Sequence, residues 1–150
     1  MNTKRLLLAI IAVFAGVWVT DFVIHGVLLQ ETYKQTMSLW RPEAEMKAHM
    51  KWLMLGQFLA AATFTMIYAR GFAEVAHLRC GIMYGLFMGL FSQATTFITF
   101  AVQPFPSYLA VRWVIAGVVQ GVLLGMLVYF VYRPAAKTAV TLAATSNPAA

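Results

Sequence analysis

Four long apolar runs, separated by short charged segments, constrain this chain more than any other feature. They cover about residues 6–29, 52–69, 81–102 and 109–132. A helix of roughly 24 residues reaches about 36 Å, which crosses a hydrocarbon core of about 30 Å with some tilt. Because a lipid-embedded backbone must satisfy its own hydrogen bonds, each run is expected to be helical. The sequence therefore predicts an all-α fold, a four-helix transmembrane bundle that forms a single domain over 1–133.

The composition agrees with this prediction. Of 150 residues, 61% are apolar and 11% are charged, whereas about 25% are charged in an average soluble domain. The net charge of +6 does not indicate a nucleic-acid partner, because the Lys and Arg residues flank the apolar runs and form no stripe on a polar face. We expect the lipid bilayer as a partner, together with further copies of the chain in a homo-oligomer or a larger membrane complex.

The segments between and after the runs differ in character. Residues 30–51 carry most of the acidic residues and are predicted to be partly helical, since Pro42 suits a first helical turn and Glu43 lies near its start. Residues 134–150 are rich in Ala, Thr, Ser and Pro and are expected to form a disordered tail. A cleavable signal peptide is the alternative for the first run, but that run continues well beyond Ala15, where a signal would end.

The distribution of Lys and Arg predicts the orientation. With the N-terminus in the cytoplasm, six of these residues lie inside and five outside, and the basic pair Lys4-Arg5 favours the same choice. We therefore expect a multi-pass protein with both termini in the cytoplasm and the 30–51 connection outside.

Two glycine series predict close helix packing. Glycines recur every four residues in the third and fourth runs, at Gly81, Gly85, Gly89, Gly117, Gly121 and Gly125. Lipid supplies no hydrophobic drive for helix association, so small residues that let two backbones approach favour packing between these helices. The alternative hypothesis is a glycine-lined conduit.

Polar residues within the runs gather at one depth. Counted from the ends of the runs, they fall in the membrane half next to the 30–51 connection, which the predicted orientation makes the outer leaflet. They predict a polar pocket open to that side, formed by Asp21, His25, Gln57, Gln93, Thr96, Thr99 and Gln120.

Asp21 is the strongest candidate for a functional residue in this pocket. An Asp at the centre of a membrane helix costs about 2.5–3.5 kcal/mol on insertion scales, and such residues often mark functional paths. His25 follows one turn later on the same face. Three hypotheses stay open for the pair: an intrahelical hydrogen bond that only satisfies both groups, a shared proton, and a bound metal ion.

A methionine-rich stretch raises two cofactor hypotheses. The candidate metal ligands are Glu45, Met46, His49, Met50 and Met54. Thioethers at this spacing suit Cu(I), but a methionine stripe at the helical period also suits adaptable packing. Haem would need His25 and His49 as axial ligands, although their estimated depths differ by about 10 Å. We therefore predict no cofactor.

Several short strings stand out along the chain. They are Asp21-x3-His25-Gly26 with Leu28-Leu29, Trp40-Arg41-Pro42, Gly81-x2-Tyr84-Gly85-x3-Gly89, and Pro104-x-Pro106 with Trp113-x3-Gly117. In these strings the chain resembles uncharacterised small four-span bacterial integral membrane proteins over most of its length. The resemblance implies a protein of the bacterial inner membrane and implies no chemistry, because such families are defined by topology.

The absence of catalytic motifs bears on function. The chain contains no HExxH, GxSxG or GxxxxGK[ST] motif, and its single cysteine is Cys80. These absences and the small size favour a non-enzymatic membrane protein, either a binding protein or an accessory subunit of a larger complex, built around the polar pocket. The alternative hypothesis is a small proton- or cation-coupled transporter that uses Asp21. A Cu(I)- or haem-binding protein ranks last.

Overall fold

Four long helices build the molecule. The structure is a computed structural model that describes residues 2–73 and 77–132, and within these ranges the chain is helical and forms no strand. The long helices are α1 (Thr3–Asp21), α3 (Glu43–Gly71), α4 (Leu78–Val102) and α5 (Ser107–Val131). Four segments are long and apolar enough to cross a membrane, namely α3, α4, α5 and α1 with its continuation to Leu28, which confirms the predicted all-α bundle and indicates a multi-pass membrane protein.

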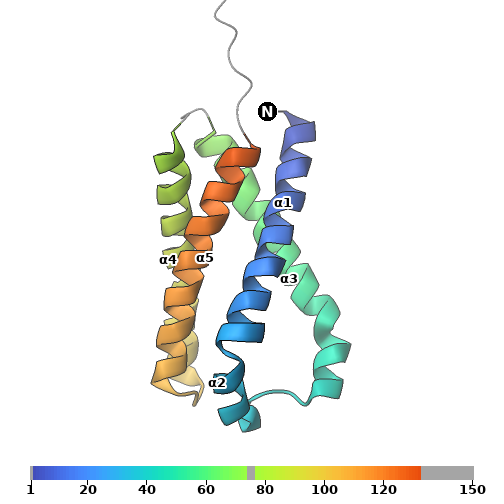
Figure 1. Ribbon diagram of the computed structural model, residues 1–150, viewed down its shortest axis with the longest axis vertical. Coiled ribbons are helices and arrows are strands. Elements are labelled where there is room, and N and C mark those ends of the chain that lie inside the picture. Colours follow the sequence, from blue (N-terminus) through green and yellow to red (C-terminus); the bar gives the residue numbers. More distant parts are fainter. Residues whose placement is uncertain (1, 74–76, 133–150) are drawn as a thin grey trace, which may run out of the picture.

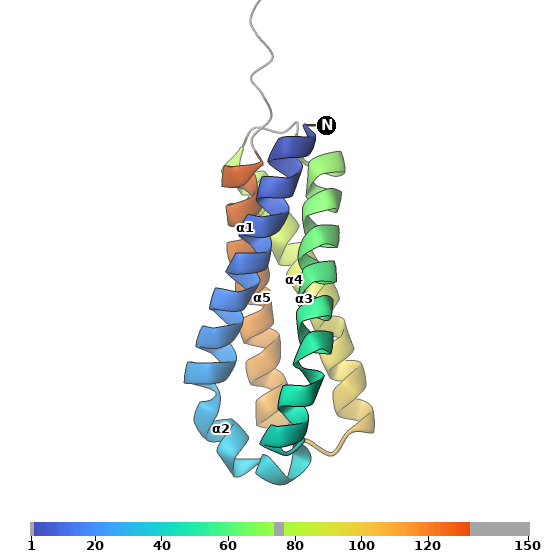
Figure 2. The same cartoon turned by 90° about the vertical axis from the view of Figure 1, so that its right-hand side faces the viewer.

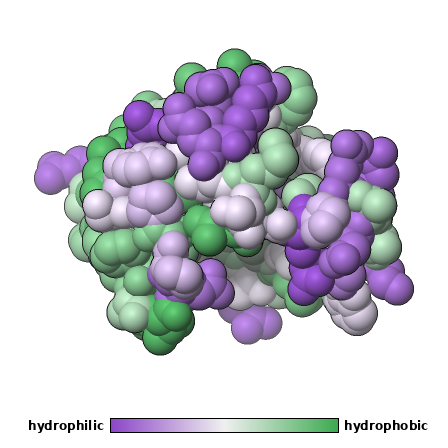
Figure 3. Space-filling model, turned by 90° about the horizontal axis from the view of Figure 1, so that it is seen from below, coloured by the Kyte–Doolittle hydropathy of each residue, from purple (hydrophilic) through white to green (hydrophobic). Residues whose placement is uncertain are grey.

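The helices run alternately in opposite directions, so the N-terminus and the end of α5 lie at the same end of the bundle (Figures 1 and 2). We call this the N-terminal end. The opposite end, called the connection end, carries the turn between α4 and α5 and the segment between α1 and α3. Viewed from below, the connection end has several hydrophilic patches with hydrophobic surface at its margin (Figure 3).

The first helix changes its winding before it ends. The α-helix α1 continues directly into the π-helix η1 (Phe22–Leu28), where the Leu29 amide donates to the carbonyl of Ile24, five residues earlier (2.9 Å). The chain then forms α2 (Gln30–Gln35) and the short 3-10 helix η2 (Met37–Leu39). These two short helices account for part of the predicted helical connection.

Helix α3 begins earlier than the second apolar run. It starts directly after Pro42 and includes the polar stretch before residue 52. The Lys47 ammonium lies 2.7 Å from the Glu43 carboxylate one turn before it, and such pairs support an exposed helical turn. The tail predicted for 134–150 lies outside the described residues.

Glycines bring α4 and α5 into backbone contact. A Cβ added to Gly85 would lie 2.2 Å from the carbonyl oxygen of Gly121, and one added to Gly125 would lie 2.2 Å from the carbonyl oxygen of Gly81. Gly89 packs on the backbone of Val118 in the same way. The two predicted glycine series thus face each other, and no larger side chain fits between these backbones.

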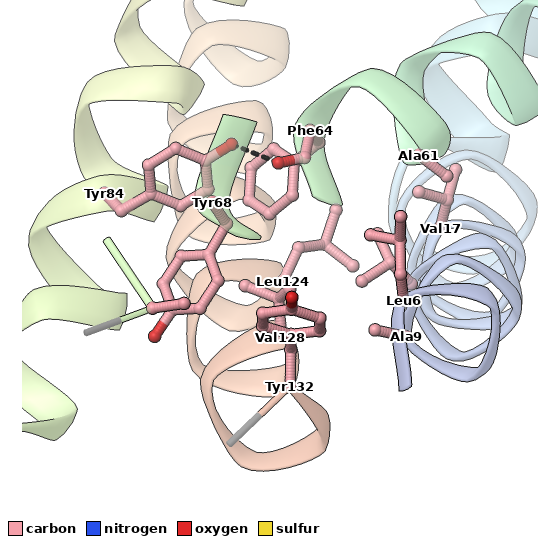
Figure 4. Close-up of a cluster of buried hydrophobic side chains, with 12 residues drawn as sticks. Leu6, Ala9, Val17, Ala61, Phe64, Tyr68, Tyr84, Leu124, Val128 and Tyr132 are labelled. Atoms are coloured by element: carbon pink, nitrogen blue, oxygen red, sulfur yellow. Dashed lines mark hydrogen bonds between the residues drawn. The ribbon is translucent and has the colours of Figure 1, made fainter. Parts of the chain in front are cut away.

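A core of apolar and aromatic side chains fills the N-terminal end (Figure 4). Ala9, Val13 and Val128 are fully buried there. The Tyr84 hydroxyl donates a hydrogen bond to the carbonyl of Phe64, which ties α4 to α3. From this contact α3 diverges from α4 and α5 toward the connection end (Figure 1).

Candidate functional site

Asp21 lies at the centre of a polar cluster made by three helices. The Nε2 atom of Gln57 on α3 donates to Asp21 Oδ2 (2.5 Å), and Nε2 of Gln120 on α5 donates to Asp21 Oδ1 (2.6 Å). Each carboxylate oxygen therefore accepts one amide hydrogen bond. We call Asp21, Gln57 and Gln120 the polar cluster.

Thr20 and the change of winding fix the position of Asp21. Gln120 Nε2 also donates to Thr20 Oγ1 (2.7 Å), and that hydroxyl donates to the Gly16 carbonyl (2.7 Å). Asp21 is the last residue of the α-helical part, directly before η1. The change of winding therefore begins at the residue after Asp21.

The Asp21 carboxylate has hydrogen-bond partners but no ion-pair partner in the described chain. Asp21 forms no ion pair with any Lys, Arg or His of the described chain; the ion pairs Lys34–Glu31, Arg41–Glu45 and Lys47–Glu43 lie in the connection and the start of α3. Asp21 is partly buried, and a carboxylate withdrawn from water is costly unless it is paired and hydrogen-bonded. Two amide donors satisfy the hydrogen bonding here, but no positive charge accompanies them.

One polar atom of the cluster lacks a partner. Gln57 Oε1 is enclosed and accepts no hydrogen bond from any described residue. A buried acceptor without a donor costs about 1–3 kcal/mol, and in native proteins such atoms are few and call for an explanation. The cluster as it stands therefore has spare capacity to accept a hydrogen bond.

A cavity of about 460 Å³ adjoins the polar cluster, and we call it the lateral cavity. All three residues of the cluster line it, together with Ser92 and apolar side chains from the four long helices. Its exposed lining residues include Thr63 on α3 and Phe91 on α4. The lateral cavity therefore opens sideways between α3 and α4, toward the surface that faces lipid.

A second cavity, of about 200 Å³, lies nearer the connection end. Its polar lining residues are His25, Gln93, Thr96, Trp113 and Gln120. Thr96 Oγ1 donates to Gln93 Oε1 (2.8 Å). Because Gly117 and Gln120 line both cavities, the two spaces lie on either side of this pair of α5 residues.

Tyr33 contacts two residues that line the second cavity, His25 and Trp113, and we call Tyr33 and Trp113 the aromatic cap. Trp113 Nε1 donates to the Tyr33 hydroxyl oxygen (2.8 Å), which also lies 2.5 Å from Nδ1 of His25. A neutral His25 that accepts the Tyr33 proton at Nδ1 carries its own proton on Nε2. Burial raises the pKa of Tyr33, against a smaller opposite effect of the Trp113 hydrogen bond, so this hydroxyl keeps its proton at neutral pH.

A larger groove lies between α1, η1 and α5. Its volume is about 680 Å³, and its lining is apolar except for Thr20, Arg112 and Gln120. Arg112 donates to Thr32 Oγ1 at the connection end. This groove holds no carboxylate, so the chemistry of the site centres on the lateral cavity.

The structure brings together some of the predicted pocket residues and separates others. Asp21, Gln57 and Gln120 contact each other, and His25, Gln93 and Thr96 line the second cavity. The intrahelical hydrogen bond considered for Asp21 and His25 is not formed, because each side chain has other partners. Thr99 donates to the carbonyl of Thr95 on its own helix (2.8 Å) and lines neither cavity.

Sequence reasoning missed Tyr33 and the role of Trp113. Both are aromatic residues with one polar atom, which seeks a partner when the ring is buried. Both residues lie near the ends of apolar runs, and Trp and Tyr are enriched at membrane interfaces. Their positions could therefore have identified them as interfacial residues.

The methionine-rich stretch lies on α3, where Met46, Met50 and Met54 are exposed. His49 Nδ1 lies 2.8 Å from the Glu45 carbonyl oxygen, one turn earlier. The ring of His25 binds Tyr33 instead. In the part of the chain that the structure describes, no three His, Cys, Asp or Glu side chains are placed to hold a metal ion.

Comparison with known proteins adds no assignment: no protein-family model, curated protein or solved structure matches this chain.

Proposed function

We propose that this chain is a non-enzymatic binding protein of the bacterial inner membrane, and that its ligand occupies the lateral cavity. The observation that carries the proposal is the convergence of Gln57 and Gln120 on the Asp21 carboxylate at the wall of a cavity open to lipid. The ligand has an apolar body and a polar head, since the cavity offers apolar walls and one polar region.

A purely structural role explains these features less well. Helix packing in this bundle already rests on glycine contacts between α4 and α5 and on the core at the N-terminal end. An unbalanced carboxylate and an unsatisfied Gln57 oxygen add cost to that packing. Ligand pockets typically combine mostly apolar walls with a few convergent polar groups, and their volumes are about 300–1,000 Å³. The lateral cavity has this composition and size.

The proposed orientation places both termini in the cytoplasm. The basic start Lys4-Arg5 supports it. Because the N-terminus and the end of α5 lie at the same end of the bundle, both are placed on the same side of the membrane. The connection end, the polar cluster and the second cavity then belong to the outer leaflet.

Retention of a native ligand tests the proposal. The protein is extracted from its own membranes into lipid nanodiscs, and bound molecules are identified by native mass spectrometry after activation. We expect a retained small molecule in the wild type that is lost in Asp21→Asn and Gln57→Leu. Glu43→Gln, an exposed carboxylate on the same helix as Gln57, serves as the control and should retain it. Equal retention by all four proteins contradicts the proposal.

The same preparation shows whether the binding protein works alone. A stable complex with other chains would make it a binding subunit, and a single species would make it independent. In both cases retention of the ligand should depend on Asp21.

A proton- or cation-coupled transporter is the second candidate. It is favoured by the position of Asp21 beside Gln120, whose side chain lines both the lateral cavity and the second cavity. Proton flux into pyranine-loaded proteoliposomes under a potassium diffusion potential measures this activity. The transporter hypothesis predicts flux that is lost in Asp21→Asn, and an unchanged flux in that variant rules it out.

A further inference from the structure

We propose that the ligand of the lateral cavity is a protonated amine with at least one N–H group, carried on an apolar chain. This inference rests on the proposed function and names the chemical class of its ligand.

The charges of the site select a cation. Asp21 supplies a negative charge, and no described Lys, Arg or His forms an ion pair with it. The two amide donors that reach its oxygens are neutral. A cationic head would supply the missing charge in a low-dielectric setting, where opposite charges attract strongly.

The hydrogen-bonding groups select a donor. Each oxygen of Asp21 accepts one hydrogen bond from a described residue and, as a carboxylate oxygen, has room for another. Gln57 Oε1 has no donor. The Ser92 hydroxyl donates its hydrogen bond to the Gly89 carbonyl (2.9 Å), so toward the cavity it can only accept one. These three groups can therefore each accept a hydrogen bond, and an ammonium group brings donors without an acceptor of its own.

The shape of the cavity gives the ligand a direction. On α1, α3 and α5 the carboxylate or amide lining residue lies nearer the connection end than the large apolar lining residues, and α3 adds the exposed Thr63 between them. On α1, Val13 lies eight residues before Asp21, which is about 12 Å along the axis. On α3 and α5, Phe64 and Leu124 lie beyond Gln57 and Gln120 in the same direction. The amine thus points to the connection end and its chain toward the bilayer centre.

This direction matches that of an amphiphile in the adjoining leaflet. An amine-bearing chain that enters between α3 and α4 keeps its head toward the membrane surface and its tail toward the bilayer centre, as it does in lipid. A bare metal ion fits less well, because hard cations take six or more oxygen ligands and most of the cavity wall is apolar.

The sequence allows a direct test, because Asp21 is the only aspartate in the chain. Protein made by cell-free synthesis with 13Cγ-labelled aspartate has a single labelled carboxylate. In nanodiscs it is mixed with 15N-decylamine, and solid-state dipolar recoupling measures the 13C–15N contact. We expect the amine nitrogen to dephase the Asp21 signal, as it would in a hydrogen-bonded ion pair.

Probes with the same ten-carbon chain and different head groups test whether the amine, and not the chain, determines binding. Decanol and decyltrimethylammonium, which lack either the charge or the N–H group, should compete with 15N-decylamine at least tenfold more weakly. Gln57→Leu should weaken decylamine binding about tenfold, while Glu43→Gln leaves it unchanged. Equal competition by decanol overturns the amine assignment, and so does displacement of decylamine by Na+ alone.

The outcomes distinguish this inference from the proposed function. If decylamine fails to reach Asp21 while a native molecule is still retained in an Asp21-dependent way, the ligand class is wrong and the binding function stands. If neither a probe nor a native molecule occupies the cavity, both proposals fail.

Discussion

The Nε2 atom of Gln57 lies 2.5 Å from Oδ2 of Asp21, a contact between side chains 36 positions apart in the sequence. The contact joins α1 to α3 seven residues before Phe64, where α3 contacts Tyr84 of α4. On the other side of the same carboxylate, Gln120 joins α5. The carboxylate therefore links three of the four long helices beside the lateral cavity.

Substitution of Gln57 and of Gln120 by leucine should lower the free energy of unfolding by different amounts. Gln120→Leu removes donors from both Asp21 and Thr20, and we expect the free energy of unfolding to fall by about 1.5–3 kcal/mol. Gln57→Leu also removes one bond to Asp21, but it eliminates the buried oxygen that has no donor. That gain offsets part of the loss, so Gln57→Leu should cost less. Reversible unfolding in mixed detergent micelles measures both values.

A surface ion pair provides the control for this comparison. Glu31→Gln breaks only the exposed pair with Lys34 (3.4 Å), and it should change stability by less than about 0.5 kcal/mol. A larger loss for Gln57→Leu than for Gln120→Leu would mean that the Gln57 oxygen is satisfied in the membrane.

Alanine substitutions at Gly85 on α4 and Gly56 on α3 should change the free energy of unfolding in different directions. Gly85→Ala places a Cβ against the Gly121 backbone, which cannot move aside as a side chain can, so we expect a loss of about 1–3 kcal/mol. Gly56→Ala meets no atom within 4 Å and should be neutral or stabilising by up to about 1 kcal/mol, because alanine favours the helix. The same unfolding assay compares them, and equal effects would contradict close packing of α4 on α5.

The fold was predictable because a bilayer permits few solutions. Apolar runs of sufficient length must form helices in lipid, and their ends fix the depth of each polar residue to within about a turn. This depth argument grouped Gln57 and Gln120 with Asp21, and the structure places these three side chains in contact.

Other features depend on tertiary structure and carry no comparable signal. The π-helix after Asp21 and the fold of residues 30–39 over the bundle bring Tyr33 to His25, and no periodicity predicts either. Thr99 shares a face with Thr96 in the sequence pattern, but one further turn carries it past the cavities, where its own backbone satisfies it. Depth and face predict which residues are near each other, and helix divergence decides which of them meet.

Tyr33→Phe should loosen the connection from the bundle. The hydroxyl is the acceptor of the Trp113 indole and the partner of His25, so its removal leaves the indole N–H without that acceptor. We expect a stability loss of about 1–3 kcal/mol and faster hydrogen exchange in residues 30–40. Ser38→Ala, an exposed change in the same connection, should alter neither. Unchanged exchange in Tyr33→Phe would show that the aromatic packing alone holds the cap.

Gly117→Ala should be rescued by a second change, unlike Gly85→Ala. A Cβ at position 117 would lie 2.0 Å from Nε2 of Gln93, and the three nearest atoms all belong to that side chain. Gln93 must then swing away and break its hydrogen bond from Thr96 (2.8 Å), which we expect to cost about 1 kcal/mol.

Truncating the displaced side chain should relieve this clash. In Gly117→Ala/Gln93→Ala the stability should exceed the sum of the two single effects by about 0.5–1 kcal/mol, because neighbouring sites in contact are not additive. Gly85→Ala/Gln93→Ala should be additive, since the atoms nearest to position 85 belong to the backbone of α5. Additivity in both pairs would mean that Gln93 does not pack on Gly117 and that the second cavity has a different wall.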